Sequence, residues 1–421
     1  MAISTPTVAE LCRSAKDASR VLARLDAATK DAALLAIASA LVERTPEILE
    51  ANRRDLEAGR ESGLSDALMD RLALDERRVA AMAEGARQIA ALPDPVGEVI
   101  DGMRLPNGLD VRRVRVPLGV VAVVYEARPN VTIDAAALAL KSGNAIVLRG
   151  SSSARHSNAV LADVAREAAE DAGLPAGALT LVAGGGREEL AELATQDGLV
   201  DLIIPRGGEG LKAALSAVAT VPVIYAASGN CHVYVDASAD LDAALDIVVN
   251  AKTQRPGVCN AAETLLVHEA VAGEFLPRAL AALRAHGVEL RLDERARALA
   301  GADGDRDATG EDFAQEFLAL VLAVGVVDSA GAAIEHVNRF GSGHSEAIVT
   351  RDWDAARAFQ LGVDSACVYV NASTRFTDGA EFGMGAEIGN STQKLHARGP
   401  IGMRELCTYR YLVEGSGQIR S

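Results

Sequence analysis

Cysteine is scarce in this chain. The five cysteines are odd in number and widely separated: Cys12, Cys231, Cys259, Cys367 and Cys407. Disulfide frameworks use paired cysteines, and zinc sites use closely spaced ones, so this distribution argues against both. We therefore expect reduced thiols and no bound metal.

Positive charge and long apolar runs are also lacking. The chain carries 42 Lys and Arg against 58 Asp and Glu, a formal net charge of −16. This balance disfavours nucleic acid and acidic membranes as partners. No apolar run approaches the about 20 residues that span a bilayer, and the N-terminus has no charged segment followed by an apolar stretch. We expect a cytoplasmic protein that binds neither membrane nor nucleic acid.

The composition is otherwise that of a globular enzyme-sized chain. With 421 residues, 49% of them hydrophobic and 24% charged, it is long enough for two or three domains. Residues 1–93 are predicted to form consecutive amphipathic helices, and 26–42 are the most periodic. Residues 109–117 then alternate apolar and basic side chains, which predicts a half-exposed strand. Such a strand suits either a surface hairpin or pairing with another subunit.

Short apolar runs alternate with helical segments from Gly119 onward. The runs are 119–125, 145–148, 179–182, 199–204 and 221–225. Continuous apolar strands that alternate with helices indicate a parallel sheet covered on both faces. Glycine-containing loops follow three of the runs, at 149–153, 183–187 and 205–210. None is a G-x-G-x-x-G fingerprint, but with Arg149 and Arg206 they suit a phosphate-rich ligand.

A second alternation of this kind begins near residues 232–236. It continues through the runs 320–327, 347–350 and 367–371, and the chain ends in a predicted strand at 406–413. Residues 301–310, GADGDRDATG, are predicted to form a surface loop. We place the domains at 1–235 and 236–400, with oligomerisation strands at 105–120, and with 401–421 as a strand that joins them.

The second domain contains the stretch KTQRPGVCNAAE, residues 252–263. Pro256 and Gly257 favour a turn before Cys259, and an apolar run at 264–267 follows, so the thiol is expected on a loop. Lys252 and Arg255 bring positive charge close in sequence, which would favour the thiolate. The alternative is a small buried apolar residue, as most free cysteines are.

Six stretches distributed along the chain resemble one family. They are 124–132 (VYEARPNVT), 251–261 (AKTQRPGVCNA), 342–350 (SGHSEAIVT), 370–379 (VNASTRFTDG), 386–389 (AEIG) and 393–400 (QKLHARGP). They are similar to the gamma-glutamyl phosphate reductases, which belong to the aldehyde dehydrogenase superfamily. The resemblance implies an α/β, aldehyde dehydrogenase-like fold: two doubly wound parallel-sheet domains, one cofactor-binding and one catalytic, plus a small β oligomerisation hairpin. It also implies a homo-oligomer and makes the glutamate kinase of the same pathway a candidate partner.

The activity implied is NADPH-dependent reduction of L-glutamyl 5-phosphate to glutamate 5-semialdehyde and phosphate, the second step of proline synthesis. Cys259 would form a thioester, and the Asn130 amide would stabilise the oxyanion. Asn130 also suits a turn after Pro129. Hydrolytic relatives carry a glutamate where this chain reads YAASGNCH, 225–232, without a carboxylate. The pattern departs from the family at Ala226 and Ala227, and at Asn390, where isoleucine is usual.

The resemblance also assigns binding roles. The substrate or phosphate group would be held by Arg128, His232, Arg255 and Arg375. The cofactor would be held by Arg149, Ser151, Gly207, Gly208 and Glu316. Arg149 is followed by serine rather than by an acid, which favours the 2′-phosphate of NADP. Glu316 would hold the nicotinamide ribose, or be a solvated carboxylate at a helix end.

Two other functions compete with this one. A non-phosphorylating aldehyde dehydrogenase would need the general base that residues 225–232 lack. A catalytically silent scaffold of the same fold would not need Cys259, Asn130 and Arg149 together.

Overall fold

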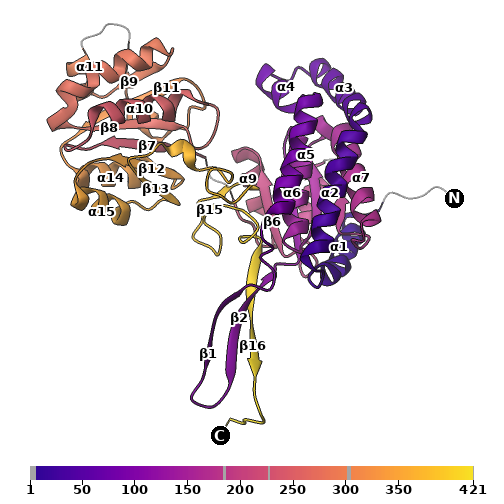
Figure 1. Ribbon diagram of the computed structural model, residues 1–421. Coiled ribbons are helices and arrows are strands. Elements are labelled where there is room, and N and C mark those ends of the chain that lie inside the picture. Colours follow the sequence, from indigo (N-terminus) through magenta and orange to yellow (C-terminus); the bar gives the residue numbers. More distant parts are fainter. Residues whose placement is uncertain (1–5, 184–185, 226–227, 301–304, 421) are drawn as a thin grey trace. The chain divides into compact units, whose positions relative to one another are not determined.

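The computed structural model describes residues 6–183, 186–225, 228–300 and 305–420. The chain forms two compact units, both visible in Figure 1. The first comprises Met1–Tyr225, Gly383–Gly389 and Ile401–Ser421, and the second comprises Ala226–Phe382 and Asn390–Pro400. No described helix is both long and apolar enough to cross a membrane.

The first unit begins with the predicted run of helices. At the start of the first helix, Thr7 accepts a hydrogen bond from the Glu10 amide and the Glu10 carboxylate accepts one from the Thr7 amide, a capping box. The second helix packs on the fifth and on α7. The five helices are α1 (Val8–Leu22), α2 (Ala27–Glu43), α3 (Thr45–Glu61), α4 (Asp66–Leu72) and α5 (Glu76–Ala91).

A four-stranded parallel sheet follows, in the order β5-β4-β3-β6. Its strands are β3 (Val120–Tyr125), β4 (Ala145–Gly150), β5 (Leu179–Leu181) and β6 (Leu202–Arg206). The helices between and after them are α6 (Asn130–Lys141), the 3-10 turn η1 (Ser152–Ala154), α7 (Arg155–Asp171), α8 (Arg187–Ala194) and α9 (Glu209–Val218). Every residue of β3 and β4 is buried, which explains the apolar runs 120–125 and 145–148. The run 221–225 forms only a bridge between Val223 and Ile203, since Pro222 has no N–H to donate.

A separate antiparallel sheet has the order β1-β2-β16. Its strands are β1 (Val99–Arg104), β2 (Asp110–Pro117) and β16 (Cys407–Glu414). The C-terminal strand thus pairs with the predicted alternating strand, and the two lie side by side in Figure 1. The hairpin starts earlier than the predicted 105–120. Its first strand, β1, begins at Val99 and ends at Arg104, where the turn begins.

The second unit is built on a seven-stranded parallel sheet with the order β10-β9-β11-β8-β7-β12-β13. The strands are β7 (Cys231–Val235), β8 (Ala262–His268), β9 (Glu289–Leu292), β10 (Arg306–Asp307), β11 (Val321–Val327), β12 (Ser345–Val349) and β13 (Cys367–Val370). The helices are α10 (Leu241–Thr253), α11 (Glu269–Ala285), α12 (Glu294–Ala300), α13 (Gly310–Ala314), α14 (Ala330–Phe340), α15 (Trp353–Gly362) and the 3-10 turn η2 (Thr374–Phe376). A short antiparallel pair, β14 (Asn390–Ser391) and β15 (Gly399–Pro400), completes it.

Two of the predicted boundaries differ from the structure. β7 belongs to the sheet of the second unit, so the units divide near residue 225 and not at 235. Residues 383–389, predicted in the catalytic domain, belong to the first unit. In the predicted loop 301–310, residues 301–304 lie outside the described residues, while β10 and the start of α13 occupy part of the rest.

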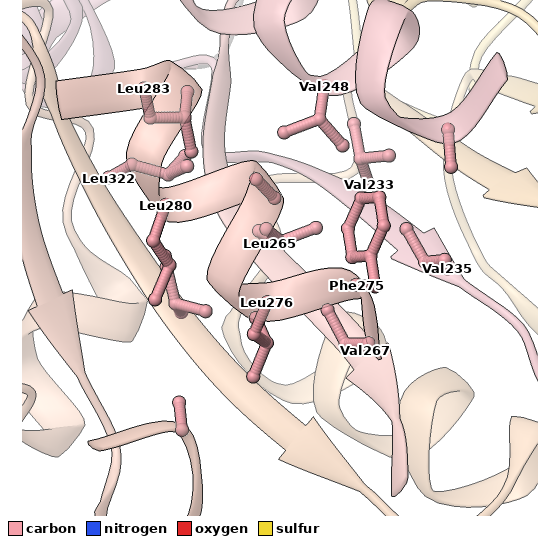
Figure 2. Packing of buried hydrophobic residues seen from close by; sticks show 14 of the residues in the cluster. Val233, Val235, Val248, Leu265, Val267, Phe275, Leu276, Leu280, Leu283 and Leu322 are labelled. Atoms are coloured by element: carbon pink, nitrogen blue, oxygen red, sulfur yellow. The ribbon is translucent and has the colours of Figure 1, made fainter. Parts of the chain in front are cut away.

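The core of the second unit lies on both faces of its sheet. Figure 2 shows Phe275, Leu276, Leu280 and Leu283 of α11 against Leu265 of the neighbouring strand. The alternate strand residue Leu266 packs instead in the α14–α15 cluster. Each fully buried side chain of this size contributes about 1.5–3 kcal/mol. Helices pack on the parallel sheets of both units, as the predicted α/β class requires, and the loops at the strand ends are left to build sites.

Candidate active site

Cys259 lies on the loop that joins α10 to β8, as predicted. All five cysteines are described and none forms a disulfide; Cys259 is half-buried, and the other four are buried. Burial raises the pKa of Cys12 to about 11 and that of Cys407 to about 12, and raises that of Cys231 well above its ordinary value. Because the thiolate is the reactive form, Cys259 is the cysteine placed to act as a nucleophile.

Arg255 and Arg375 are in the electrostatic neighbourhood of this thiol. Burial lowers the pKa of Arg375 first, the charge of Arg255 lowers it further, and a Cys259 thiolate raises it. The Arg375 Nε donates to Gln254 Oε1 at 2.8 Å. Two predicted phosphate-binding residues thus share one region with Cys259.

The neighbouring Asn260 fixes the segment that carries Arg375. Its Nδ2 donates to the carbonyl oxygens of Thr377, at 2.8 Å, and Arg375, at 3.3 Å. The Thr374 hydroxyl donates back to the Asn260 carbonyl at 2.7 Å. The 374–377 turn is therefore anchored directly to the loop of Cys259.

The Cys259 backbone is held from the other side by residues that precede β7. A Cβ at Gly229 would lie 1.6 Å from the Cys259 carbonyl oxygen, so only glycine fits there. The Gly229 amide donates to Glu316 Oε1 at 2.6 Å, and the Cys231 thiol donates to the Cys259 carbonyl at 3.2 Å. These contacts fix the direction of the Cys259 peptide.

Two predicted contributions need correction. Lys252 is fully buried and paired with Glu263, so its charge is not the one available to stabilise a thiolate. His232 is also fully buried, and its Nδ1 lies 3.0 Å from Glu346 Oε2. A side chain without exposed surface cannot meet a phosphate from solvent, so His232 is a core residue of the second unit.

In the first unit, Asn130 begins α6 with its side chain exposed. Its Nδ2 donates to Asp134 Oδ2 at 2.9 Å. Burial raises the pKa of Asp134 to about 6, while the Asn130 hydrogen bond and the charge of Arg206 oppose the rise. Half-buried Arg128 lies just before the helix, and Ala127 has a φ of 32°, a strained left-handed value that favours glycine.

The predicted cofactor residues of this unit gather at the carboxyl edge of its sheet. The Ser151 hydroxyl, after β4, accepts from the Ala127 amide at 3.1 Å. Gly207 and Gly208 follow β6, and the Gly208 amide donates to Glu126 Oε2 at 3.1 Å. Arg149 is buried, and its Nη2 donates to the Gly186 carbonyl at 2.8 Å. Burial lowers the Arg149 pKa, while Glu189 and Glu126 oppose this.

The remaining predictions are placed as follows. Glu316 belongs to the second unit with Cys259, and its ribose contact stays a prediction. Ala226 and Ala227 lie outside the described residues. Asn390 is buried in β14, and neither polar atom of its side chain has a hydrogen-bond partner among the described residues. Within the described ranges, no three His, Cys, Asp or Glu side chains are arranged to hold a metal ion.

Four residues of these sites carried no role in the sequence prediction: Glu126, Asp134, Gly229 and Glu263. One signal was available, because Glu263 is a carboxylate beside an apolar strand and a buried charge requires a partner. Glu126 and Gly229 are recognised only from contacts between distant segments, and Asp134 from its hydrogen bond with Asn130.

Comparison with known proteins gives a consistent result. Residues 2–300 match the model of the aldehyde dehydrogenase family. The chain is 57% identical over 406 residues to the gamma-glutamyl phosphate reductase of Moorella thermoacetica, covering 96% of this chain and 97% of that one. The crystal structure of gamma-glutamyl phosphate reductase from Thermotoga maritima superposes with a TM-score of 0.96 at 46% identity, covering 99% and 100%. An engineered glycolyl-CoA reductase with bound NADP+ shares the fold at 15% identity, with a TM-score of 0.69 and coverage of 98% of each chain.

Proposed function

The chain belongs to the gamma-glutamyl phosphate reductase family of the aldehyde dehydrogenases, and we propose from this that it reduces L-glutamyl 5-phosphate to L-glutamate 5-semialdehyde and phosphate. This is the second step of proline synthesis from glutamate. The observation that carries the proposal is Cys259, the one cysteine that is not buried, on the same loop as Arg255 and within electrostatic reach of Arg375. A thiol nucleophile in a region with two guanidinium groups suits an anionic acyl phosphate.

The residues of the second unit account for the first chemical step. The Cys259 thiolate attacks the acyl carbon, the bond from that carbon to the phosphate oxygen breaks, and phosphate leaves with the electron pair. Arg255 and Arg375 stabilise the departing charge. The product on the enzyme is a thioester.

The second step returns Cys259 to its free form. When bound, NADPH supplies the hydride that reduces the thioester to the aldehyde level. Gly229 and Cys231 hold the Cys259 carbonyl. The Cys259 N–H, on the other side of the same Cα, is the oxyanion donor that the resemblance implies. The second donor expected there, the Asn130 amide, stays a prediction from the resemblance. Collapse of the tetrahedral oxyanion expels the thiolate and releases the semialdehyde.

A phosphorylating enzyme must protect this thioester from water. No carboxylate occurs in residues 225–232. Two carboxylates near Cys259 serve other contacts: Glu263 accepts from Lys252 and the Leu318 amide, and Glu316 accepts from the Gly229 amide. The absence of a carboxylate from 225–232 supports the phosphorylating function over the non-phosphorylating one, because hydrolysis of the thioester needs a general base to activate water.

The first unit would hold a nicotinamide dinucleotide at the carboxyl edge of its parallel sheet. The residues fit an anionic ligand: the N-terminus of α9 follows Gly207 and Gly208, Arg149 lies near the end of β4, and Ser151 follows that strand. We infer NADPH as the preferred form because Arg149 can contact a 2′-phosphate. The carboxylates of Glu189 and Glu126 also interact with the Arg149 charge, so a bound 2′-phosphate would compete with them for this guanidinium.

Replacing Arg149 tests the cofactor preference. Arg149→Ala should raise the KM for NADPH by about 10- to 100-fold, the loss expected for one charge-assisted contact, and leave the KM for NADH nearly unchanged. Arg166→Ala on α7, which removes a surface arginine paired with Asp163, serves as the control. An equal rise in the KM for NADPH and for NADH would mean that Arg149 contacts a part of the dinucleotide that both cofactors share.

The β1-β2-β16 sheet supports a homo-oligomer. Its side chains include Val99, Met103, Tyr409, Tyr411 and Val413, all exposed in the single chain. β1 and β16 are the outer strands among those described, so their edges can pair with a second copy. Sedimentation equilibrium should therefore show an oligomer, and a stable monomer would contradict this. A complex with glutamate kinase and a cytoplasmic location remain predictions.

The function is tested most simply at Cys259. Cys259→Ser should lower NADPH oxidation with glutamyl phosphate by more than about 1,000-fold, because a serine hydroxyl is rarely ionised without a general base. Thermal unfolding should match the wild type, which shows that the fold is kept. Turnover above that level in a pure variant would contradict the assignment, and would favour another nucleophile.

A further inference from the structure

A fully buried ion pair closes the base of the Cys259 loop. Lys252 lies in the last turn of α10 and Glu263 near the start of β8, so the pair brackets the loop on both sides. The Lys252 Nζ donates to Glu263 Oε2, and neither side chain has exposed surface. The pair thus joins the two elements between which Cys259 is held.

Stability alone does not account for this pair. Two charges moved out of water lose hydration that their attraction only partly restores, and apolar side chains of similar volume are often as stable or more so. Burial raises the pKa of Glu263 to about 7, with Lys252 opposing and Glu316 adding to the rise. Burial lowers the pKa of Lys252, while Glu263, Cys231 and Glu316 oppose this. An expensive pair at this position calls for another role.

The second oxygen of Glu263 extends the contact to a distant segment. Glu263 Oε1 accepts from the Leu318 amide at 3.1 Å. Leu318 has a φ of 53°, a left-handed conformation that is costly for a bulky residue, and its side chain is 43% exposed. Burial of the side chain does little to stabilise this conformation, and the hydrogen bond that the Leu318 amide donates to Glu263 does stabilise it.

Glu316, two residues before Leu318, connects this segment to the Cys259 loop through Gly229. Glu316 Oε1 accepts from the Gly229 amide, and Gly229 packs against the Cys259 carbonyl. The contacts therefore form a closed series: Lys252, Glu263, Leu318, Glu316, Gly229 and Cys259.

We propose that the Lys252–Glu263 pair is a positioning device that sets the direction of the Cys259 peptide through the 316–318 segment and Gly229. The proposal rests on the proposed function in one respect, that Cys259 is the nucleophile. Lys252 and Glu263 themselves do not contact the substrate.

Glu263→Gln tests the positioning role because it keeps the size of the side chain and removes its charge. In Glu263 one carboxylate oxygen accepts from Lys252 and the other from the Leu318 N–H. A glutamine side chain has one oxygen, so it cannot accept at both positions. We expect kcat to fall by about 10- to 100-fold, the scale of a displacement near 1 Å in an active site, with the KM for NADPH within about twofold. Alkylation of Cys259 by iodoacetamide at a fixed pH should be as fast as in the wild type or faster, since loss of a nearby negative charge cannot disfavour the thiolate.

A double variant separates positioning from stability. Lys252→Met with Glu263→Leu replaces the pair by apolar side chains and should restore the thermal unfolding temperature, yet kcat should stay low because the Leu318 amide has lost its acceptor. The matched control is Asp305→Asn, which breaks the Arg284–Asp305 pair of the same unit and shares none of these contacts. It should keep the wild-type kcat.

The outcomes are distinct. Wild-type kcat in Glu263→Gln, or recovery of kcat together with stability in the double variant, would overturn the proposal. A parallel loss of kcat and alkylation in a folded Glu263→Gln variant would also overturn it, because the pair would then act on thiol reactivity. If Cys259→Ser keeps activity, the proposed function itself fails, and that result is independent of these variants.

Discussion

Gly229 is the residue whose replacement the structure constrains most severely. In Gly229→Ala the new Cβ would overlap the Cys259 carbonyl oxygen, so one of the two backbones must move. We expect a loss of kcat of at least about 100-fold, because a small displacement of the nucleophile is sufficient for that. The control is Gly273→Ala in α11, where an added Cβ meets nothing within 4 Å; it should be active and about 0.5–1 kcal/mol more stable. Steady-state kinetics of both variants decide the matter, and a fully active Gly229→Ala would contradict the account.

At the level of residues, the sequence predicted what local chemistry determines. Cys259 and Arg255 could be found because they share one short loop, and Arg375 because it lies in a recognisable stretch. The pairing of Lys252 with Glu263 could not be predicted because it depends on how α10 packs on β8. The burial of His232 against Glu346 depends on β7 and β12 being neighbours in the sheet. A basic residue close to a cysteine in sequence, such as Lys252, can therefore be paired elsewhere and leave the thiolate without its charge.

At the level of elements, the start of α6 carries a titration that can be measured. The Asp134 pKa is raised from its ordinary 3.8 to about 6, chiefly by burial. The folded protein therefore binds this proton more tightly than the unfolded chain, so Asp134 contributes stability at low pH that is lost as pH rises from about 4 to about 6. Relative to Asp134→Asn, the unfolding free energy of the wild type should fall across this window and be level above it. Urea unfolding at several pH values tests this, and a difference that rises with pH would contradict the burial of Asp134.

The elements themselves were largely predictable, because their periodicity is local. The helical pattern of 26–42 became α2, and the unbroken apolar runs became the buried strands β3 and β4. β1 was missed, since Gly102 and charged residues interrupt its pattern and all six of its residues are exposed. The extended sequence at 221–225 failed as a strand because Pro222 cannot donate to a ladder.

At the level of the whole molecule, two parallel-sheet units and a separate antiparallel sheet were predicted and found. Their limits were less accessible. The chain returns to the first unit at residues 383–389 and again from Ile401, and such returns leave no mark in hydrophobic periodicity. The domain roles, cofactor binding in the first unit and catalysis in the second, remain proposals that rest on which residues each unit contains.

The central claim is that the thioester on Cys259 is passed to phosphate and not to water. Its most direct test is oxidation of glutamate 5-semialdehyde with NADP+, with and without added phosphate. Residues 225–232 supply no carboxylate to activate water, so the thioester should resist hydrolysis, and turnover should rise with phosphate from near zero. Equal rates in phosphate-free buffer, with glutamate as the product, would contradict the account.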